Sequence, residues 1–121
     1  MTRRRRLQTV TLRRPDGNVA CERCQVTDRM RPRMRGLLGR RGLERGEGML
    51  LRPASSIQTF FMRFPIDAVF LDRDLVVIGT VEHIGPWATA SRPGARAVLE
   101  LAAGTCERLR VKKGDRLLLG T

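Results

Sequence analysis

All four phenylalanines of the chain lie in one short stretch, from Phe60 to Asp72. Between the two ends of this stretch, Arg63 and Asp67 are the only polar residues. The chain has no tyrosine and a single tryptophan, Trp87, so nearly all of its aromatic packing surface is gathered here. The stretch therefore predicts the centre of the core, and it is the first place to look for a site.

The length of 121 residues suits one domain, 1–121, with a basic tail at 1–6 that can fray. A composition of 41% hydrophobic and 30% charged residues is typical of a globular protein. No apolar run reaches the roughly 20 residues of a membrane helix, and no apolar segment of an export signal follows the basic start. We expect a cytoplasmic protein with no membrane span.

Charge is unevenly spread along the chain. The formal net charge is +12, and most of the excess lies in residues 1–53. Such an arginine-rich half is able to bind phosphates, as in nucleic acid or an acidic partner. Codon bias in a GC-rich genome explains the arginines equally simply, and residues 1–53 contain no aromatic residue for base stacking. Nucleic-acid binding is therefore possible but not favoured.

The three cysteines are Cys21, Cys24 and Cys106. An odd number without an export signal favours reduced thiols. In a regular strand, Cys21 and Cys24 would point to opposite faces, and a zinc site would also need Cys106 and His83. We therefore expect no metal and no cofactor.

The pattern along the chain is mostly that of short strands. Residues 7–13 and 19–26 form a hairpin around Pro15-Asp16-Gly17-Asn18, and Asp72-Arg73-Asp74 is a second tight turn. Residues 28–38 have helical spacing, 36–48 form a glycine-rich loop, and a short helical turn capped by Thr105 runs to Leu109. The fold class is mainly β, a compact and mostly antiparallel barrel or folded sandwich with one or two short helices. The other expected strands are 49–51, 57–62, 66–71, 75–81, 97–101 and 116–119.

Several sequence segments occur in the order typical of one family. They are Arg35-Gly36-Leu37-Leu38, Gly48-Met49-Leu50-Leu51, Phe60-Phe61-Met62, Ile66 to Asp72, Val98 to Gly104 and Lys113-Gly114-Asp115. Together they resemble the domain of unknown function 192 family over about residues 20–119. The family often has tryptophan at the position of Phe61 and an Asn-Thr connection before Asp67, which this chain lacks. The resemblance implies a small β-rich domain of bacteria and archaea whose activity has not been assigned.

Asp67 is the unusual group of the central stretch. In a strand it shares a face with Val69 and Leu71, and a carboxylate buried there needs a partner. Arg35 and Arg63 are the candidate partners, and a structural tie is favoured over a catalytic role. Glu100 alternates with Leu99 and Leu101, so it faces either solvent or a pocket.

The leading hypothesis is a binding module for a small molecule or a protein partner, with a pocket beside the Phe60–Asp72 strands. Phe60, Phe64 and Phe70 would pack the core. One alternative is an enzyme that uses Asp67 and Glu100 with Arg35 as an anion clamp, and the other is the basic-patch binder. We expect a monomer or weak dimer. The candidate ligand-binding residues are Arg35, Met49, Phe61, Met62, Asp67, Trp87 and Glu100.

Overall fold

The computed structural model describes residues 8–27, 42–60 and 62–120. This part of the chain is mostly β, as the sequence predicts. Its strands are β1 (Gln8–Arg13), β2 (Val19–Thr27), β3 (Glu47–Leu51), β4 (Ser56–Gln58), β5 (Ile66–Leu71), β6 (Val77–Ile84), β7 (Thr89–Ser91), β8 (Ala97–Ala102) and β9 (Leu118–Leu119), and its helix is α2 (Thr105–Leu109).

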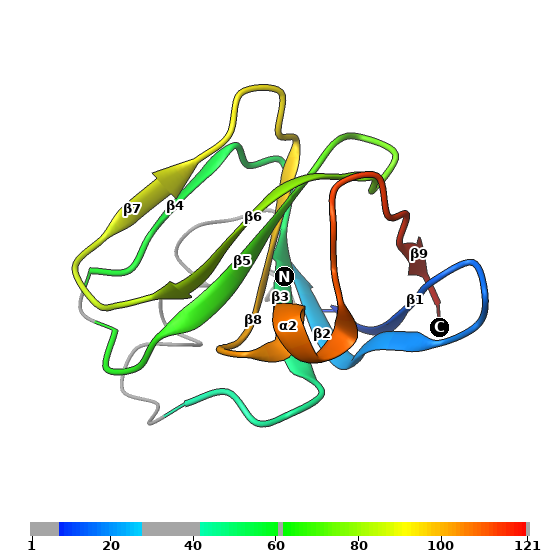
Figure 1. Cartoon of the computed structure of the whole chain (residues 1–121), viewed down its shortest axis with the longest axis horizontal. Coiled ribbons are helices and arrows are strands. Elements are labelled where there is room, and N and C mark those ends of the chain that lie inside the picture. Colours follow the sequence, from blue (N-terminus) through cyan, green and yellow to red (C-terminus); the bar gives the residue numbers. More distant parts are fainter. Residues whose placement is uncertain (1–7, 28–41, 61, 121) are drawn as a thin grey trace, which may run out of the picture.

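Seven strands form one strongly curled sheet in the order β6-β5-β8-β3-β2-β1-β9, and β4 and β7 form a separate pair (Figure 1). The pairs in the large sheet are antiparallel except β2 and β3, which are parallel. Figure 1 shows the β4–β7 pair on one side of β5 and β6. The helix α2 follows the C-terminal end of β8. The fold is therefore a curled half-barrel with a small second sheet.

The central strands are buried on both faces because the large sheet separates two apolar clusters. Every residue of β5 is buried, as are five of the six in β8. One cluster includes Val69, Leu99, Leu101 and the α2 residue Cys106. The other includes Ala68, Phe70, Val98 and the β4 residue Ile57. Strands covered on both sides have nearly continuous apolar sequences, which explains why residues 66–71 are apolar apart from Asp67.

The two predicted turns form as expected. In the first, Gly17 has φ 89° and its N–H donates to the carbonyl of Arg14 at 2.8 Å. A side chain at this φ is strained, so glycine suits the position. In the second, Asp72 Oδ1 accepts hydrogen bonds from the N–H groups of Asp74 and Val76, at 2.8 and 3.0 Å. The Asp72 carboxylate thus shapes the turn between β5 and β6.

Several sequence expectations are corrected. The strand expected at 57–62 ends at Gln58, because Thr59 bonds to the 85–88 loop. β7 lies in a stretch where no strand was expected. Gly104, in the left-handed conformation, is the N-cap of α2 instead of Thr105. The predicted helix at 28–38 and most of the glycine-rich loop lie outside the described residues.

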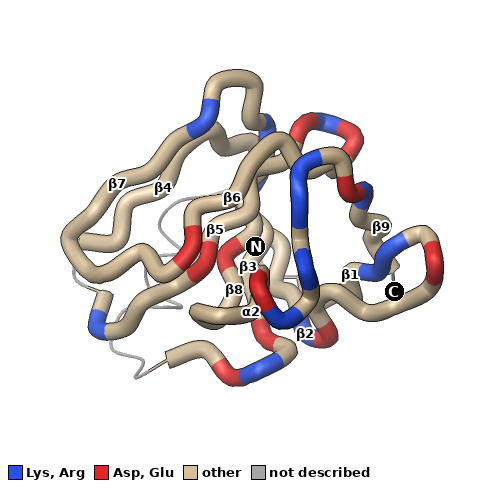
Figure 2. The backbone as a smooth tube through the Cα atoms, in the orientation of Figure 1, with Lys and Arg blue, Asp and Glu red and all other residues tan. Residues whose placement is uncertain are grey.

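Basic residues are gathered along the segment between α2 and β9, beside the β1–β2 loop (Figure 2). Of the arginines that make residues 1–53 basic, those at 3–6 and 29–41 lie outside the described residues. No helix in the described ranges is long and apolar enough to cross a membrane.

Candidate functional site

The Asp67 carboxylate is fully buried and accepts three hydrogen bonds from the main chain. Oδ1 accepts from the N–H of His83 at 2.9 Å. Oδ2 accepts from the N–H groups of Gly104 at 3.0 Å and Cys106 at 2.9 Å. The sequence predicted Arg35 or Arg63 as the partner, but these bonds come from backbone amides. Arg63 is exposed, and Arg35 lies outside the described residues.

The position of these amides follows from a β-bulge in β6. Ile66 pairs with Ile84 and Ala68 pairs with Val81, so β6 has one more residue than β5 across Asp67. The bulge contains His83, whose φ is 52°. A bulge leaves a backbone group without its ladder partner. The Asp67 side chain accepts that N–H and also binds the start of α2, so it fastens β6 and α2 to β5.

Glu100 lies on the opposite face of the sheet from Asp67. Across β5 and β8, Asp67 pairs with Leu101 and Ala68 pairs with Glu100. Paired residues share a face and successive residues alternate, so the two carboxylates point to opposite sides. The structure therefore places them apart, although the enzyme hypothesis requires one cavity. Glu100 is also fully buried, which excludes the solvent-facing position, one of the two expected for it.

Phe60 and Trp87 form an exposed aromatic pair. Their ring centroids are 5.6 Å apart with an interplanar angle of 27°, and they are 38% and 62% exposed. Thr59 holds this corner, since its Oγ1 donates to the carbonyl of Gly85 at 2.6 Å and accepts from the N–H of Ala88 at 2.9 Å. The expected core position of Phe60 is therefore wrong.

Three other residues of the central stretch lie in the core, and one of them, Met62, was expected to line a pocket. Phe64 and Phe70 are buried, as predicted. Met62 is a core residue at 5% exposure and packs in the same cluster. Phe61 lies outside the described residues.

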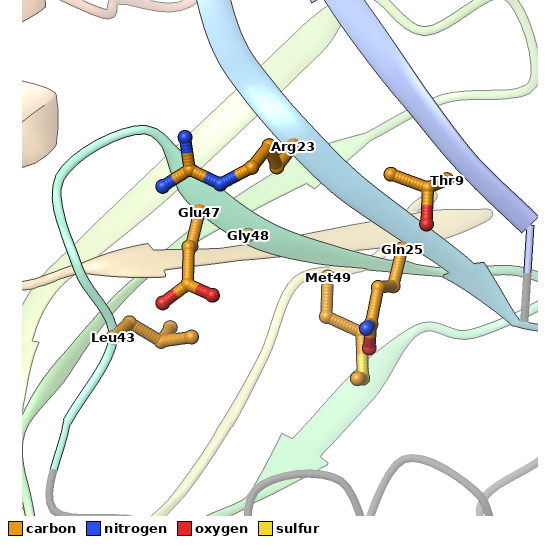
Figure 3. A pocket seen from close by; sticks show the side chains of 7 residues that line it. All are labelled: Thr9, Arg23, Gln25, Leu43, Glu47, Gly48 and Met49. Carbon is orange, nitrogen blue, oxygen red and sulfur yellow. The ribbon is translucent and has the colours of Figure 1, made fainter.

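A mixed polar and apolar pocket lies on the Glu100 face of the sheet, beside β2 and β3 (Figure 3). Its volume is about 170 Å³. Met49 pairs with Glu100 in the β3–β8 register, and among the described residues it is the predicted site residue that lines this pocket. Other side chains of the lining are those of Thr9, Arg23, Gln25, Leu43 and Glu47.

The register of β2 and β3 brings the polar side chains of this pocket together. Arg23 pairs with Glu47, and Gln25 pairs with Met49. In Figure 3 the Glu47 carboxylate and the Gln25 amide extend in the same direction from neighbouring strands.

The charged side chains of the pocket also have contacts within the fold. Glu47 accepts a hydrogen bond from the N–H of Glu44 at 2.8 Å. Arg23 forms long ion pairs with exposed acids, at 3.6 Å to Glu22 and 3.8 Å to Glu44. Arg23 Nη2 also donates to the carbonyl of Arg45 at 3.4 Å. Exposed ion pairs of this length contribute little, so an anion in the pocket would compete with the two acids for the guanidinium.

The sequence did not identify Arg23, Gln25 and Glu47 as site residues. Arg23 and Gln25 flank the buried Cys24 and therefore share the less buried face of β2. That alternation was a usable signal. Their meeting with Glu47 depends on the parallel pairing of β2 and β3, which no local pattern indicates.

The three cysteines are free and buried, and all three belong to the cluster that includes Val69. Val10 pairs with Cys24 and Leu12 with Cys21, so β2 carries one extra residue between the two cysteines. This bulge turns both thiols to the core and corrects the expectation of opposite faces. In the described ranges, no group of three or more His, Cys, Asp and Glu side chains is arranged to hold a metal ion.

The thiols differ in acidity. A hydrogen bond with the Cys24 side chain lowers the pKa of Cys21 despite its burial. The same hydrogen bond, with burial, raises the pKa of Cys24. Burial, and then the charge of Asp67, raise the pKa of Cys106 to about 12.

Limited alkylation of the native protein at pH 8 is expected to label Cys21 before Cys106, and Cys24 last, because the pKa of Cys24 is raised most. A pKa of about 12 leaves roughly one Cys106 thiol in ten thousand ionised at this pH, and the thiolate is the nucleophile. Iodoacetamide labelling followed by peptide mass spectrometry measures the order, with full labelling in urea as the control. Labelling of Cys106 before Cys21 would contradict the assignment.

Comparison with known proteins identifies the family. The sequence model of the DUF192 family, described as an uncharacterized ACR, matches residues 11–119. A crystal structure of a "putative transcription regulator" from Sinorhizobium meliloti 1021 is similar, with a TM-score of 0.80 and 25% identity over 97% of this chain and 98% of that one. A protein of unknown function from Novosphingobium aromaticivorans DSM 12444 has a TM-score of 0.76 and 25% identity over 93% of this chain and 84% of that one. No curated protein matches the chain. The family match spans nearly the whole chain, and the chain therefore belongs to the DUF192 family.

Proposed function

We propose that this protein is a binding module whose site for a small polar molecule is the pocket beside β2 and β3. The observation that carries the proposal is the lining of this pocket, which combines Arg23, Glu47 and the Gln25 amide with the apolar Met49 and Leu43. Binding sites typically join apolar walls with a few polar groups that fix the orientation of the ligand.

The size and charge of the pocket indicate the class of ligand. A volume of about 170 Å³ is smaller than that of pockets for drug-sized molecules, which have roughly 300–1,000 Å³. An anionic group would pair with Arg23, and a hydrogen-bond donor would pair with the Glu47 carboxylate. Small metabolites with both an acid and an amine or hydroxyl group have this chemistry.

The buried neighbours of the pocket support binding without a large rearrangement. Met49 is 2% exposed and lies between β2 and β8 in the large sheet. A rigid strand layer reduces the entropy that a site loses when the ligand binds. The sequence pointed to a pocket beside the Phe60–Asp72 strands. The pocket proposed instead lies on the same large sheet, and its strand β3 is two positions from β5.

A thermal-shift screen against small acids, amines and hydroxy acids tests the proposal. A ligand present at 100 times its Kd stabilises the native state by about 2.7 kcal/mol, which is a shift in Tm of roughly 10 °C for a domain of this size. The shift is expected to fall by more than half in Arg23→Gln. The matched control is Arg96→Gln, because Arg96 is exposed and lies outside the pocket lining. Equal shifts in both variants, or none in the wild type, would refute the site.

A second candidate is an electrostatic partner such as nucleic acid. The net charge of +12 favours it, and the structure from S. meliloti is described as that of a "putative transcription regulator". This function requires oligonucleotide binding that weakens steeply with salt. We further propose that the chain is a single-domain, cytoplasmic monomer or weak dimer, and size-exclusion chromatography with light scattering tests its oligomeric state.

A further inference from the structure

A second cavity, which we call the basic cavity, lies between the β1–β2 loop and the segment that follows α2. Its volume is about 380 Å³. Figure 2 shows the basic positions of the segment between α2 and β9 close to the β1–β2 loop. The charged residues of its lining are Arg14, Asp16, Arg110, Lys112, Asp115 and Arg116.

Both acidic residues of the lining are engaged within the fold. Asp16 accepts hydrogen bonds from the N–H and the side-chain amide of Asn18, at 2.9 and 3.0 Å, and so shapes the β1–β2 turn. Asp115 Oδ2 accepts from the N–H of Lys112 at 3.1 Å and pairs with Arg14 Nη2 at 3.5 Å. The carboxylates therefore build the walls of the cavity, while the side chains of Arg110, Lys112 and Arg116 are exposed to it.

Arg14 has an unfilled hydrogen-bonding position. Its side chain is 21% exposed, and its Nε atom is buried with no hydrogen-bond acceptor among the described residues. A buried charged donor without an acceptor costs free energy, and an anion in the cavity would supply the acceptor. The ion pair of Arg14 with Asp115 is long, so it leaves much of the guanidinium charge uncompensated.

The backbone that carries these cations is tied to the large sheet. The N–H of Gly114 donates to the carbonyl of Val77 at 2.8 Å, and the N–H of Val77 donates to the carbonyl of Asp115 at 2.7 Å. Arg116 forms a bridge with Val76. These bonds hold the loop against the start of β6, so the positions of its cationic residues are set before a ligand arrives.

We propose that the basic cavity binds a small phosphorylated molecule, with Arg14, Arg110, Lys112 and Arg116 as the groups that contact phosphate. Guanidinium groups match phosphate oxygens in pairs, and four cations around one cavity suit a group of two or more negative charges. The volume is in the range of small-molecule sites. The lining contains no aromatic residue and includes two acids, which disfavours single-stranded nucleic acid, whose bases stack on aromatic rings.

Titration with inorganic pyrophosphate and with a nucleoside monophosphate, at low and physiological salt, tests the proposal. Isothermal calorimetry and phosphorus NMR on the full chain are expected to show binding at one site. Arg110→Gln and Arg116→Gln are each expected to weaken it by about tenfold, since one charge-assisted hydrogen bond is removed. Tighter binding of the nucleotide than of pyrophosphate would indicate that the natural ligand is a nucleotide rather than a free phosphate.

Arg63→Gln is the matched control, because it removes the same charge from an exposed arginine outside the cavity lining. It is expected to change the affinity less than twofold. Absence of pyrophosphate or nucleotide binding at low salt would overturn the proposal, as would an equal loss in Arg63→Gln. If an oligonucleotide bound more tightly than either small molecule, and its affinity fell steeply with salt, the ligand of the cavity would be a nucleic acid and the proposal would be wrong. The Arg23→Gln variant should bind pyrophosphate normally, which separates this cavity from the pocket beside β2 and β3.

Discussion

Replacing Asp67 with alanine is expected to lower the free energy of unfolding by about 3–5 kcal/mol. The change removes the acceptor of three backbone N–H groups, those of His83, Gly104 and Cys106. Each buried donor left without an acceptor costs about 1–3 kcal/mol. A domain of this length is stable by only about 5–15 kcal/mol, so the loss is a large part of the total. Urea unfolding followed by far-UV circular dichroism measures it.

Two variants separate the role of the carboxylate from a general effect of mutation. Asp67→Asn keeps one acceptor oxygen, so it is expected to lose about half as much stability as the alanine variant. Asp74→Ala removes an exposed acid from the β5–β6 turn and is expected to cost less than about 0.5 kcal/mol. A loss below 1 kcal/mol in Asp67→Ala would show that these hydrogen bonds do not hold β6 and α2 in place. Unchanged binding at the pocket beside β2 and β3 in a folded Asp67→Asn would agree with a structural role.

The parts of the fold that depend on local pattern could be predicted from the sequence. Residues 66–71 form β5 because a run that is apolar apart from Asp67 suits a strand that is buried on both faces. The turns at 15–18 and 72–74 follow from the conformations that glycine and aspartate favour. The family resemblance, which rests on several separated motifs, is confirmed by the match over residues 11–119.

The candidate site could not be predicted in the same way, because it depends on register between strands. Alternation shows which residues of one strand share a face, but it does not show how β5 aligns with β8. That alignment places Asp67 and Glu100 on opposite faces. The bulges opposite Asp67 and between Cys21 and Cys24 change the alternation itself. Each bulge depends on tertiary hydrogen bonds and packing, which leave no short-range sequence signal.

The contact of β3 with β8 also explains why glycine is needed at position 48, and Gly48→Ala is expected to destabilise the protein by about 2–3 kcal/mol. A Cβ atom there would lie 2.8 Å from Cys21 Sγ, 2.9 Å from the carbonyl oxygen of Glu100 and 2.9 Å from Leu101 Cδ2. The carbonyl belongs to the neighbouring strand, so it cannot move without distorting the β3–β8 ladder. Urea unfolding of the purified variant measures the change.

Gly85→Ala is the matched control, because a Cβ atom at Gly85 meets nothing within 4 Å and its φ is not in the left-handed range. It is expected to change stability by less than about 0.5 kcal/mol. Equal stability of the two variants would contradict the prediction, because β3 and β8 would then have to move apart to admit the Cβ atom at no cost in free energy. A large loss in Gly48→Ala alone would instead show that close packing around β3 is fixed. Since Met49 follows Gly48 directly, the same variant is expected to weaken ligand binding at the pocket beside β2 and β3, which links the packing of the core to the geometry of the proposed site.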